Sequence, residues 1–409
     1  MPILMTPAAT ADEGQGVVAV FLVVAMVLVL AKLLGELFLR LGQPAVVGEL
    51  IAGVILGPTF LHIVAAPIDG ADAAEATIGV LANLGVLWLM FGAGLEVDLG
   101  DFRRAGRPAA LAASLGVILP MLAGAGLGLA FGYSWSEAIF LGLVLSATSV
   151  SISAQTLLEM GRLRSPVGTA LLGAAVLDDI LVIVLLSVFV GIETGDGSLA
   201  GVGSQIGVMA LVVSGVALVA WVALPRVAQL GHRMHVSQGA LALVLASVLL
   251  LAWATEDLGG MAAITGAFLA GVGMARSHLR EEIERGLAPL AFAFFVPLFL
   301  ANIGLQANLR TLRADGLIFG LLLLLLAGLS KFAGAGLGAR LGGMSGRPSV
   351  QLGIGMISRG EVGLIVAGVG VAGGLLTEDL FAAVVLMVIG TTLATPFLLR
   401  WAFRREEDR

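Results

Sequence analysis

The sequence predicts an all-α integral membrane protein of about thirteen transmembrane helices. Of its 409 residues, 59% are hydrophobic and only 12% are charged, whereas a soluble domain carries about 25% charged residues. Apolar runs of about eighteen residues or more recur along the chain, and each is long enough to cross a hydrocarbon core of about 30 Å. We therefore expect a single membrane unit over residues 1–409, with no soluble domain.

Apolar runs between polar breaks set the positions of the expected spans. They lie at residues 17–39, 44–61, 76–96, 108–131, 136–159, 166–192, 199–224, 236–255, 259–275, 286–305, 315–340, 348–374 and 379–402. No Lys or Arg precedes the first run, and the run is too long for the apolar part of a signal peptide. We therefore interpret it as the first span.

The distribution of basic residues indicates the orientation. With the N-terminus outside, the inside loops hold 17 of the 22 Lys and Arg residues, from Arg40 to Arg409. The outside loops hold only Arg310 and Arg313. Because Lys and Arg accumulate in cytoplasmic loops, the sequence predicts a multi-pass protein of the cell inner membrane, with an outside N-terminus and a cytoplasmic C-terminus.

Short sequence matches recur at an offset of seven spans. The matched segments are Gly94–Leu99 with Gly304–Leu309. Gly48 together with Ala52–Val54 matches Gly266 together with Ala270–Val272. Since seven is odd, the two copies enter the membrane in opposite directions. Such an inverted-topology repeat is typical of secondary transporters.

Asp178, Asp179 and Lys331 are ionisable residues near the middle of expected spans. Asp178 and Asp179 are adjacent on the sixth span, about 100° apart around the helix, so one can meet a partner helix while the other faces a cavity. Lys331 lies midway through the eleventh span; an ammonium group can lose its proton, whereas a guanidinium effectively cannot. Charged groups are costly at this depth. Ion binding is favoured for the acids over a role in helix packing, and a permanent ion pair is the alternative for Lys331.

The fifth and twelfth spans are expected to be discontinuous. Ser146–Ser151 places four hydroxyls in the fifth, and Gly355–Glu361 places opposite charges beside glycines in the twelfth. Interrupted helices expose backbone carbonyls and helix-dipole ends at the membrane midplane, where a dehydrated cation can bind. Glu361 would offset helix N-termini or pair with Lys331, and Arg359 would offset C-termini.

Other features favour simple structural interpretations. Lys32 and Glu36 lie four apart on the first span, near its inner end, so we expect them to form a local ion pair or to extend to the membrane surface. The chain has no Cys and four His, which we interpret as solvated. Gly368–Gly373 fits a dinucleotide-binding pattern but follows no strand, so it indicates close helix packing. We expect no cofactor and no nucleotide or nucleic-acid partner.

Five motifs resemble those of the monovalent cation/proton antiporter family 2. They are Leu41–Pro44, Gly48–Leu50, Leu56–Pro58, Leu177–Asp179 and Ser358–Val362. The double aspartate with Lys331 and Glu361 is most similar to NapA-type sodium/proton antiporters. Potassium efflux relatives carry Gln-Asp at the aspartate pair and a cytoplasmic nucleotide-binding domain, and this sequence has neither.

The resemblance implies roles for particular residues. Asp179 would be the main carboxylate for Na+ and H+, and Asp178 would be the partner of Lys331. Thr148 and Ser149 would line the ion site where the broken helices cross, with Glu361 near Lys331. The implied fold is NhaA-like.

The resemblance also implies a homodimer within the lipid bilayer. A mobile core domain would comprise mainly residues 76–192 and 286–374. A dimerisation domain would comprise mainly residues 17–61, 199–275 and 379–402.

The sequence therefore predicts a transporter, not an enzyme, that exchanges Na+ for H+ by alternating access. Li+ and K+ remain open as substrates. If Lys331 releases a proton when Na+ binds, the exchange is electrogenic. The alternatives are a K+/H+ antiporter of the same family and a sodium-coupled symporter for an organic anion. A gated channel would lack saturable exchange, and an aspartyl protease needs two Asp on facing helices.

Overall fold

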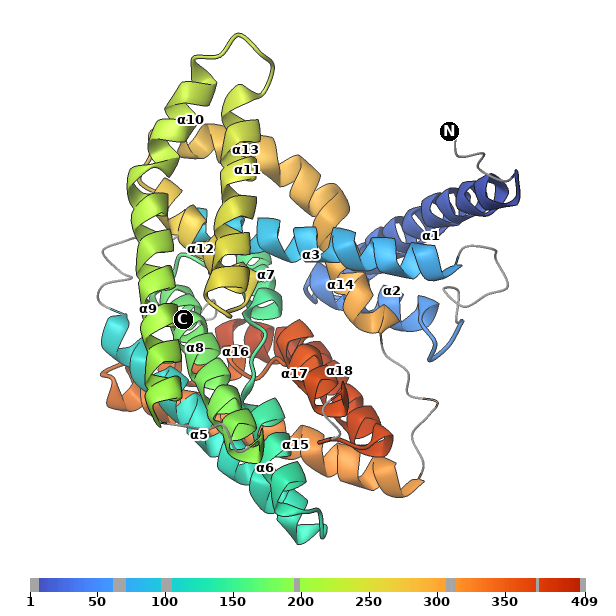
Figure 1. Ribbon diagram of the computed structural model, residues 1–409, viewed down its shortest axis with the longest axis vertical. Helices are drawn as coiled ribbons and strands as arrows, with labels where there is room; N and C mark the ends of the chain where they lie inside the picture. Colours follow the sequence, from blue (N-terminus) through green and yellow to red (C-terminus); the bar gives the residue numbers. More distant parts are fainter. Residues whose placement is uncertain are drawn as a thin grey trace, which may run out of the picture. The chain divides into compact units, whose positions relative to one another are not determined.

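The computed structural model describes residues 7–61, 71–96, 105–194, 199–306, 310, 314–372 and 375–404, and these ranges contain helices and no strand (Figure 1). Contacts divide the chain into two compact units. Unit 1 comprises Met1–Val86 and Pro289–Thr311, and unit 2 comprises Leu87–Ala288 and Leu312–Arg409. The expectation of an all-α chain is thus met throughout the described part.

Unit 1 contains five helical elements. They are α1 (Pro7–Arg40), α2 (Ala45–Leu56), most of α3 (Ala71–Leu95), the short π-helix η3 (Ala291–Phe295) and α14 (Val296–Leu305). A small apolar cluster joins them, with Val27 of α1, Ile78 of α3 and Leu298 of α14 fully buried.

Unit 2 contains the remaining elements, together with the last residues of α3. They are α5 (Gly106–Ala130), α6 (Trp135–Ser146), α7 (Val150–Glu159), α8 (Pro166–Thr194), α9 (Leu199–Val222), α10 (Leu224–His232), α11 (Gly239–Trp253), η2 (Ala254–Leu258), α12 (Ala263–Met274), most of α13 (Arg280–Leu290), α15 (Ala314–Leu341), α16 (Gly346–Gly355), α17 (Glu361–Ala372) and α18 (Glu378–Arg404).

Every expected span coincides with a helix or an interrupted helix. Among the described residues, ten helical segments are long and apolar enough to cross a membrane, and α2 and α12 are shorter apolar helices. The remaining expected span, residues 348–374, is divided into α16 and α17. The number of crossings stays a prediction. One expected loop is wrong, since residues 224–232 form α10, where Pro225 lies in the first turn and breaks no helical hydrogen bond.

Glycines of the repeated motifs produce equivalent close contacts. In unit 1, a Cβ on Gly53 of α2 would overlap the Ala301 carbonyl of α14, and one on Gly304 would overlap the backbone of α2. In unit 2, the equivalent Gly271 of α12 and Gly94 of α3 face each other in the same way. Helix α12 corresponds to α2, and α14 corresponds to α3, each at an offset of seven spans. The packing of α2 on α14 is therefore equivalent to the packing of α12 on α3.

A second glycine pair follows the same rule. A Cβ on Gly48 would overlap the Leu34 backbone of α1, and a Cβ on Gly266 would overlap the Leu251 carbonyl of α11. The α1–α2 and α11–α12 contacts are thus equivalent. Since small residues let membrane helices approach closely, the repeated glycines build the same helix crossing twice.

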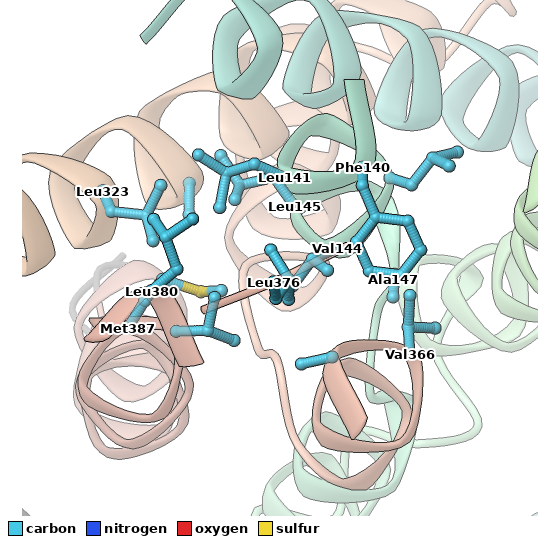
Figure 2. Close-up of a cluster of buried hydrophobic side chains, with 14 of the residues drawn as sticks. Phe140, Leu141, Val144, Leu145, Ala147, Leu323, Val366, Leu376, Leu380 and Met387 are labelled. Carbon is cyan, nitrogen blue, oxygen red and sulfur yellow. The ribbon is translucent and has the colours of Figure 1, made fainter. Parts of the chain in front are cut away.

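The interrupted helices of unit 2 are held by a large apolar core. Phe140, Leu141, Val144 and Leu145 of α6 are buried against α15, α17 and α18. Figure 2 shows these side chains gathered around Leu376, Leu380 and Met387. Further along α15, Gly334 and Gly338 allow its backbone to approach that of α5. This packing fixes the positions of the helix ends at the interruptions.

We predict that Gly94→Ala destabilises the protein. Its new Cβ would overlap the Phe268 carbonyl of α12, and overpacking of this kind costs about 1–3 kcal/mol. Gly92→Ala is a matched control on the same helix, because a Cβ there has no neighbour within 4 Å and alanine is favoured over glycine in a helix. Thermal unfolding of the purified variants should give a lower midpoint for Gly94→Ala only; equal midpoints would contradict the assigned crossing.

Candidate functional site

The two interrupted helices meet at their interruptions. Helix α6 ends at Ser146 and α7 begins at Val150, with extended backbone at Ala147 and Ser149. The Ser149 N–H donates a hydrogen bond of 3.0 Å to the carbonyl of Ser358, which lies in the interruption between α16 and α17. The Ser153 hydroxyl donates to the Gly355 carbonyl at the end of α16. The two predicted interruptions are therefore present and joined to each other.

Arg359 neutralises the exposed carbonyls at the end of α16. Its guanidinium is fully buried and donates to the carbonyls of Met356 and Ile357 at 3.1 and 3.3 Å. The backbone N–H of Arg359 donates to the Thr391 hydroxyl of α18, and its carbonyl accepts a hydrogen bond from the Thr392 hydroxyl of the same helix. A cation is favourable at a helix C-terminus, so Arg359 occupies the position that the sequence predicted for it.

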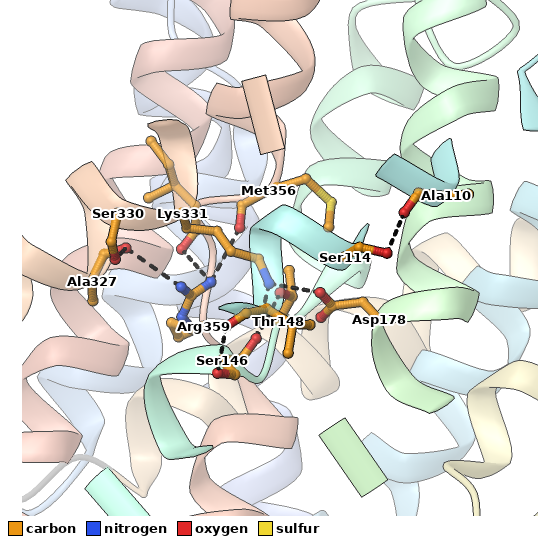
Figure 3. Close-up of polar contacts among 12 residues, drawn as sticks. Ala110, Ser114, Ser146, Thr148, Asp178, Ala327, Ser330, Lys331, Met356 and Arg359 are labelled. Atoms are coloured by element: carbon orange, nitrogen blue, oxygen red, sulfur yellow. Dashed lines mark hydrogen bonds and ion pairs between the residues drawn. The ribbon is translucent and has the colours of Figure 1, made fainter. Parts of the chain in front are cut away.

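Lys331 neutralises the end of α6 and pairs with an acid. Its ammonium group is fully buried and lies 2.7 Å from Asp178 Oδ1 and 2.9 Å from the Ser146 carbonyl oxygen. Figure 3 shows Lys331 reaching from α15 between Asp178 and the α6–α7 interruption. The contact with Asp178 agrees with the family resemblance, whereas the contact with Ser146 was not foreseen.

Asp178 is an incompletely satisfied acid in this cluster. Its side chain is fully buried, and its second carboxylate oxygen, Oδ2, has no hydrogen-bond partner among the described residues. An unsatisfied charged acceptor is costly in a dry interior. The pair therefore has the capacity to accept one further polar group or cation.

Asp179 faces a different part of unit 2. It is 8% exposed and borders a cavity of about 10 Å³ lined by Met90, Val150, Leu172, Ala175, Val176, Ile264, Thr265 and Phe268. Such a volume holds about one water-sized occupant. The Thr265 hydroxyl of α12 lies 3.4 Å from Asp179 Oδ2. The two acids thus diverge as expected from their adjacent positions on α8.

The other predicted site residues have local contacts. The Thr148 hydroxyl lies 3.5 Å from the Ser146 carbonyl oxygen, and the Ser149 hydroxyl lies 2.8 Å from that of Ser151. Both hydroxyls therefore lie in the α6–α7 interruption. The side chain of Glu361 lies outside the described residues, so its predicted proximity to Lys331 stays a prediction.

Sequence reasoning missed Thr265 and assigned the wrong partner to Lys32. Thr265 precedes the repeat glycine Gly266, but nothing in the sequence connects it to Asp179. Lys32 Nζ lies 2.7 Å from Glu49 of α2, while Glu36 pairs with Arg40. The expected Lys32–Glu36 pair is wrong because α1 packs on α2 and brings a buried carboxylate within reach of Lys32.

Comparisons with known proteins agree with this architecture. The profile of the transmembrane sodium/hydrogen exchanger family matches residues 21–405. The Na(+)/H(+)-K(+) antiporter GerN of Bacillus cereus is 39% identical over 94% of this chain and 96% of its own length. The Na(+)/H(+) antiporter of Enterococcus hirae is 32% identical over 93% of this chain and 97% of its own length.

A solved structure shows the same fold. The sodium proton antiporter MjNhaP1 from Methanocaldococcus jannaschii superposes with a TM-score of 0.69 at 16% identity, covering 94% of this chain and 97% of that one. With a family profile that matches nearly the whole length and relatives at 39% and 32% identity, the chain belongs to the sodium/hydrogen exchanger family.

Proposed function

We propose that this protein exchanges Na+ for H+ across the membrane by alternating access. The observation that carries the proposal is the buried Asp178–Lys331 pair beside the crossing of two interrupted helices, with Asp179 at an adjacent small cavity. GerN is named as a Na(+)/H(+)-K(+) antiporter, and the relative from Enterococcus hirae is named as a Na(+)/H(+) antiporter. Membrane-embedded acids of this kind mark ion and proton pathways in transporters.

In this proposal, Na+ and H+ compete for Asp179. An ionised carboxylate with the Thr265 hydroxyl beside it offers oxygen ligands, which suit a hard monovalent cation. A proton on the same carboxylate removes its charge and hence its affinity for Na+. Because only one of the two cations is held at a time, alternating access couples their movements without ATP.

Lys331 links the second acid to the exchange. Sodium at Asp179 would weaken the attraction between Asp178 and the ammonium group, so that Lys331 releases its proton more easily. Two protons would then move for each Na+, and transport would be electrogenic. Asp178 Oδ2 has no hydrogen-bond partner among the described residues. This oxygen can therefore contact the incoming cation once Lys331 has lost its proton, which supports this step.

The choice of cation is proposed from the aspartate pair. The Asp178-Asp179 sequence favours Na+ over K+, because potassium efflux relatives carry Gln-Asp there. The name of GerN includes K+ as well as Na+, so K+/H+ exchange is the second candidate. A sodium-coupled symporter differs from both in moving no proton in the opposite direction.

The expected assembly and orientation are part of the proposal. We place the protein in the cell inner membrane as a homodimer, with the N-terminus outside and the C-terminus in the cytoplasm. The mobile core would comprise mainly residues 76–192 and 286–374. The dimerisation domain would comprise mainly residues 17–61, 199–275 and 379–402.

Asp179→Asn should abolish cation-driven proton flux. The amide keeps the shape of the side chain but has neither the charge nor the exchangeable proton. Removing a charged interaction costs about 1.5–3 kcal/mol, or roughly tenfold or more in cation affinity. Purified protein in liposomes with a pH-sensitive dye, challenged in turn with Na+, Li+ and K+, gives the measurement and the selectivity.

The matched control is Asp257→Asn, because Asp257 is exposed at the end of η2. It should exchange as the unaltered protein does. Retained Na+-driven flux in Asp179→Asn would remove this residue from the site. Na+ uptake without proton counterflow in the unaltered protein would favour the symporter.

Lys331→Gln should abolish the electrical component of transport. Glutamine cannot carry a proton at this position, so at most one proton would leave for each Na+. A voltage-sensitive dye in the same liposomes should report no Na+-driven membrane potential, while any remaining exchange would be electroneutral. Unchanged electrogenic exchange by Lys331→Gln would exclude Lys331 as a proton carrier.

Lys331→Gln should also destabilise the protein, and Asp178→Asn should restore stability in the double variant. The single change leaves a buried carboxylate without its cation, which costs about 3–5 kcal/mol. The double variant has two neutral amides at the same positions. Thermal unfolding of the single and double variants, measured without Na+, gives the coupling energy, and additive effects would show that the 2.7 Å pair contributes little to stability.

A further inference from the structure

Three arginines converge on a cavity at the end of α18, outside the ion-pair cluster. The cavity measures about 200 Å³ and is lined by Arg162, Arg400, Arg404, Met160 and Phe403. Arg162 follows α7, whereas Arg400 and Arg404 belong to the last turns of α18. None of the residues assigned to ion exchange lines it. All five lining residues lie in unit 2.

Arg400 carries a donor that the described residues leave unsatisfied. Its Nε atom is buried and has no hydrogen-bond partner among them. Basic residues at the cytoplasmic end of a span usually extend into water, and a buried guanidinium nitrogen without an acceptor is unlike that arrangement. A guanidinium presents its N–H groups in a planar fork that fits a phosphate group. The cavity is therefore suited to an anionic oxygen acceptor.

The neighbouring apolar side chains indicate the depth of the cavity. Trp401, next to Arg400 on α18, is 52% exposed, and Phe397 and Leu398 on the preceding turn are also exposed. Tryptophan is enriched where the hydrocarbon core meets the lipid headgroups. The three arginines consequently lie where lipid phosphates are found. Basic pockets of this kind, between helix ends on the cytoplasmic side, suit anionic headgroups.

We propose that this cavity binds the phosphate group of an anionic phospholipid. The guanidinium groups of Arg162, Arg400 and Arg404 would donate to the phosphate oxygens, with Met160 and Phe403 as the apolar wall. Its volume is below the range of about 300–1,000 Å³ typical of pockets that enclose a whole drug-sized molecule, so the cavity holds the headgroup while the acyl chains stay in the bilayer. The bound lipid connects the end of α7 to the end of α18.

The test is lipid binding to the purified full-length protein in a neutral detergent. Thermal unfolding is followed during titration with short-chain phosphatidylglycerol, short-chain phosphatidylcholine or inorganic phosphate. A ligand that binds the folded protein raises the unfolding midpoint in a saturable manner. Phosphatidylglycerol should do so, and the other two should not at the same concentrations.

The variants locate the site. Arg400→Gln should raise the apparent dissociation constant for phosphatidylglycerol by about tenfold or more, and R162Q/R400Q/R404Q should remove the saturable effect. Arg400→Lys keeps the charge without the planar fork, so its affinity should be intermediate. The matched control is Arg233→Gln, an exposed arginine near the end of α10, which should bind as the unaltered protein does. Midpoints measured without lipid report whether each variant is folded.

Three results would overturn the proposal. Equal stabilisation of the unaltered protein and of R162Q/R400Q/R404Q would assign the effect to lipid elsewhere on the surface. Stabilisation by inorganic phosphate as strong as that by lipid would assign the cavity to a soluble anion. Lipid binding that appears only in E406Q/E407Q/D408N would assign it to the acidic end of the chain itself.

Discussion

The site depends on the requirement that backbone groups inside a membrane be satisfied without water. Interrupting a helix at this depth exposes the carbonyls of its last turn, and both interruptions here are stabilised by a buried cation. Lys331 contacts the last carbonyl of α6, and Arg359 contacts the carbonyls that follow α16. The same ammonium group of Lys331 also pairs with Asp178. One side chain therefore both stabilises the end of α6 and takes part in the proposed transport chemistry. Any change in the charge of Lys331 therefore alters the end of α6 and the acid together.

Much of this arrangement could be predicted from the sequence because its signals are local. Apolar run length locates the helices, hydroxyl and glycine clusters locate the interruptions, and intramembrane charges such as Asp178 and Lys331 indicate the candidate site. The rest depends on contacts between distant segments. Thr265 reaches Asp179 across 86 positions of the chain, and Glu49 rather than Glu36 is the partner of Lys32. Neither pairing follows from helical spacing, since each is set by which faces of two helices pack together.

The repeated glycines connect the sequence repeat to its structural purpose. Gly53 with Gly304, and Gly94 with Gly271, let two pairs of helices cross at backbone contact. Because each of these crossings joins a helix of one copy to a helix of the other, the matched motifs reflect a packing requirement and do not themselves mark a binding site. The chemistry is less symmetric, since Lys331 and Arg359 both come from the second copy.

This asymmetry has a consequence for how the protein is made. The end of α6 is stabilised by a residue 185 positions further along the chain. At a synthesis rate of about 5–20 residues per second, roughly 10–40 seconds pass between the emergence of Ser146 and that of Lys331 from the ribosome. During that interval the carbonyl of Ser146 lacks the ammonium group that contacts it in the folded protein, and the Thr148 hydroxyl, 3.5 Å away, is its local polar neighbour. The buried cation at this helix end is therefore added only when the second half of the chain has been made.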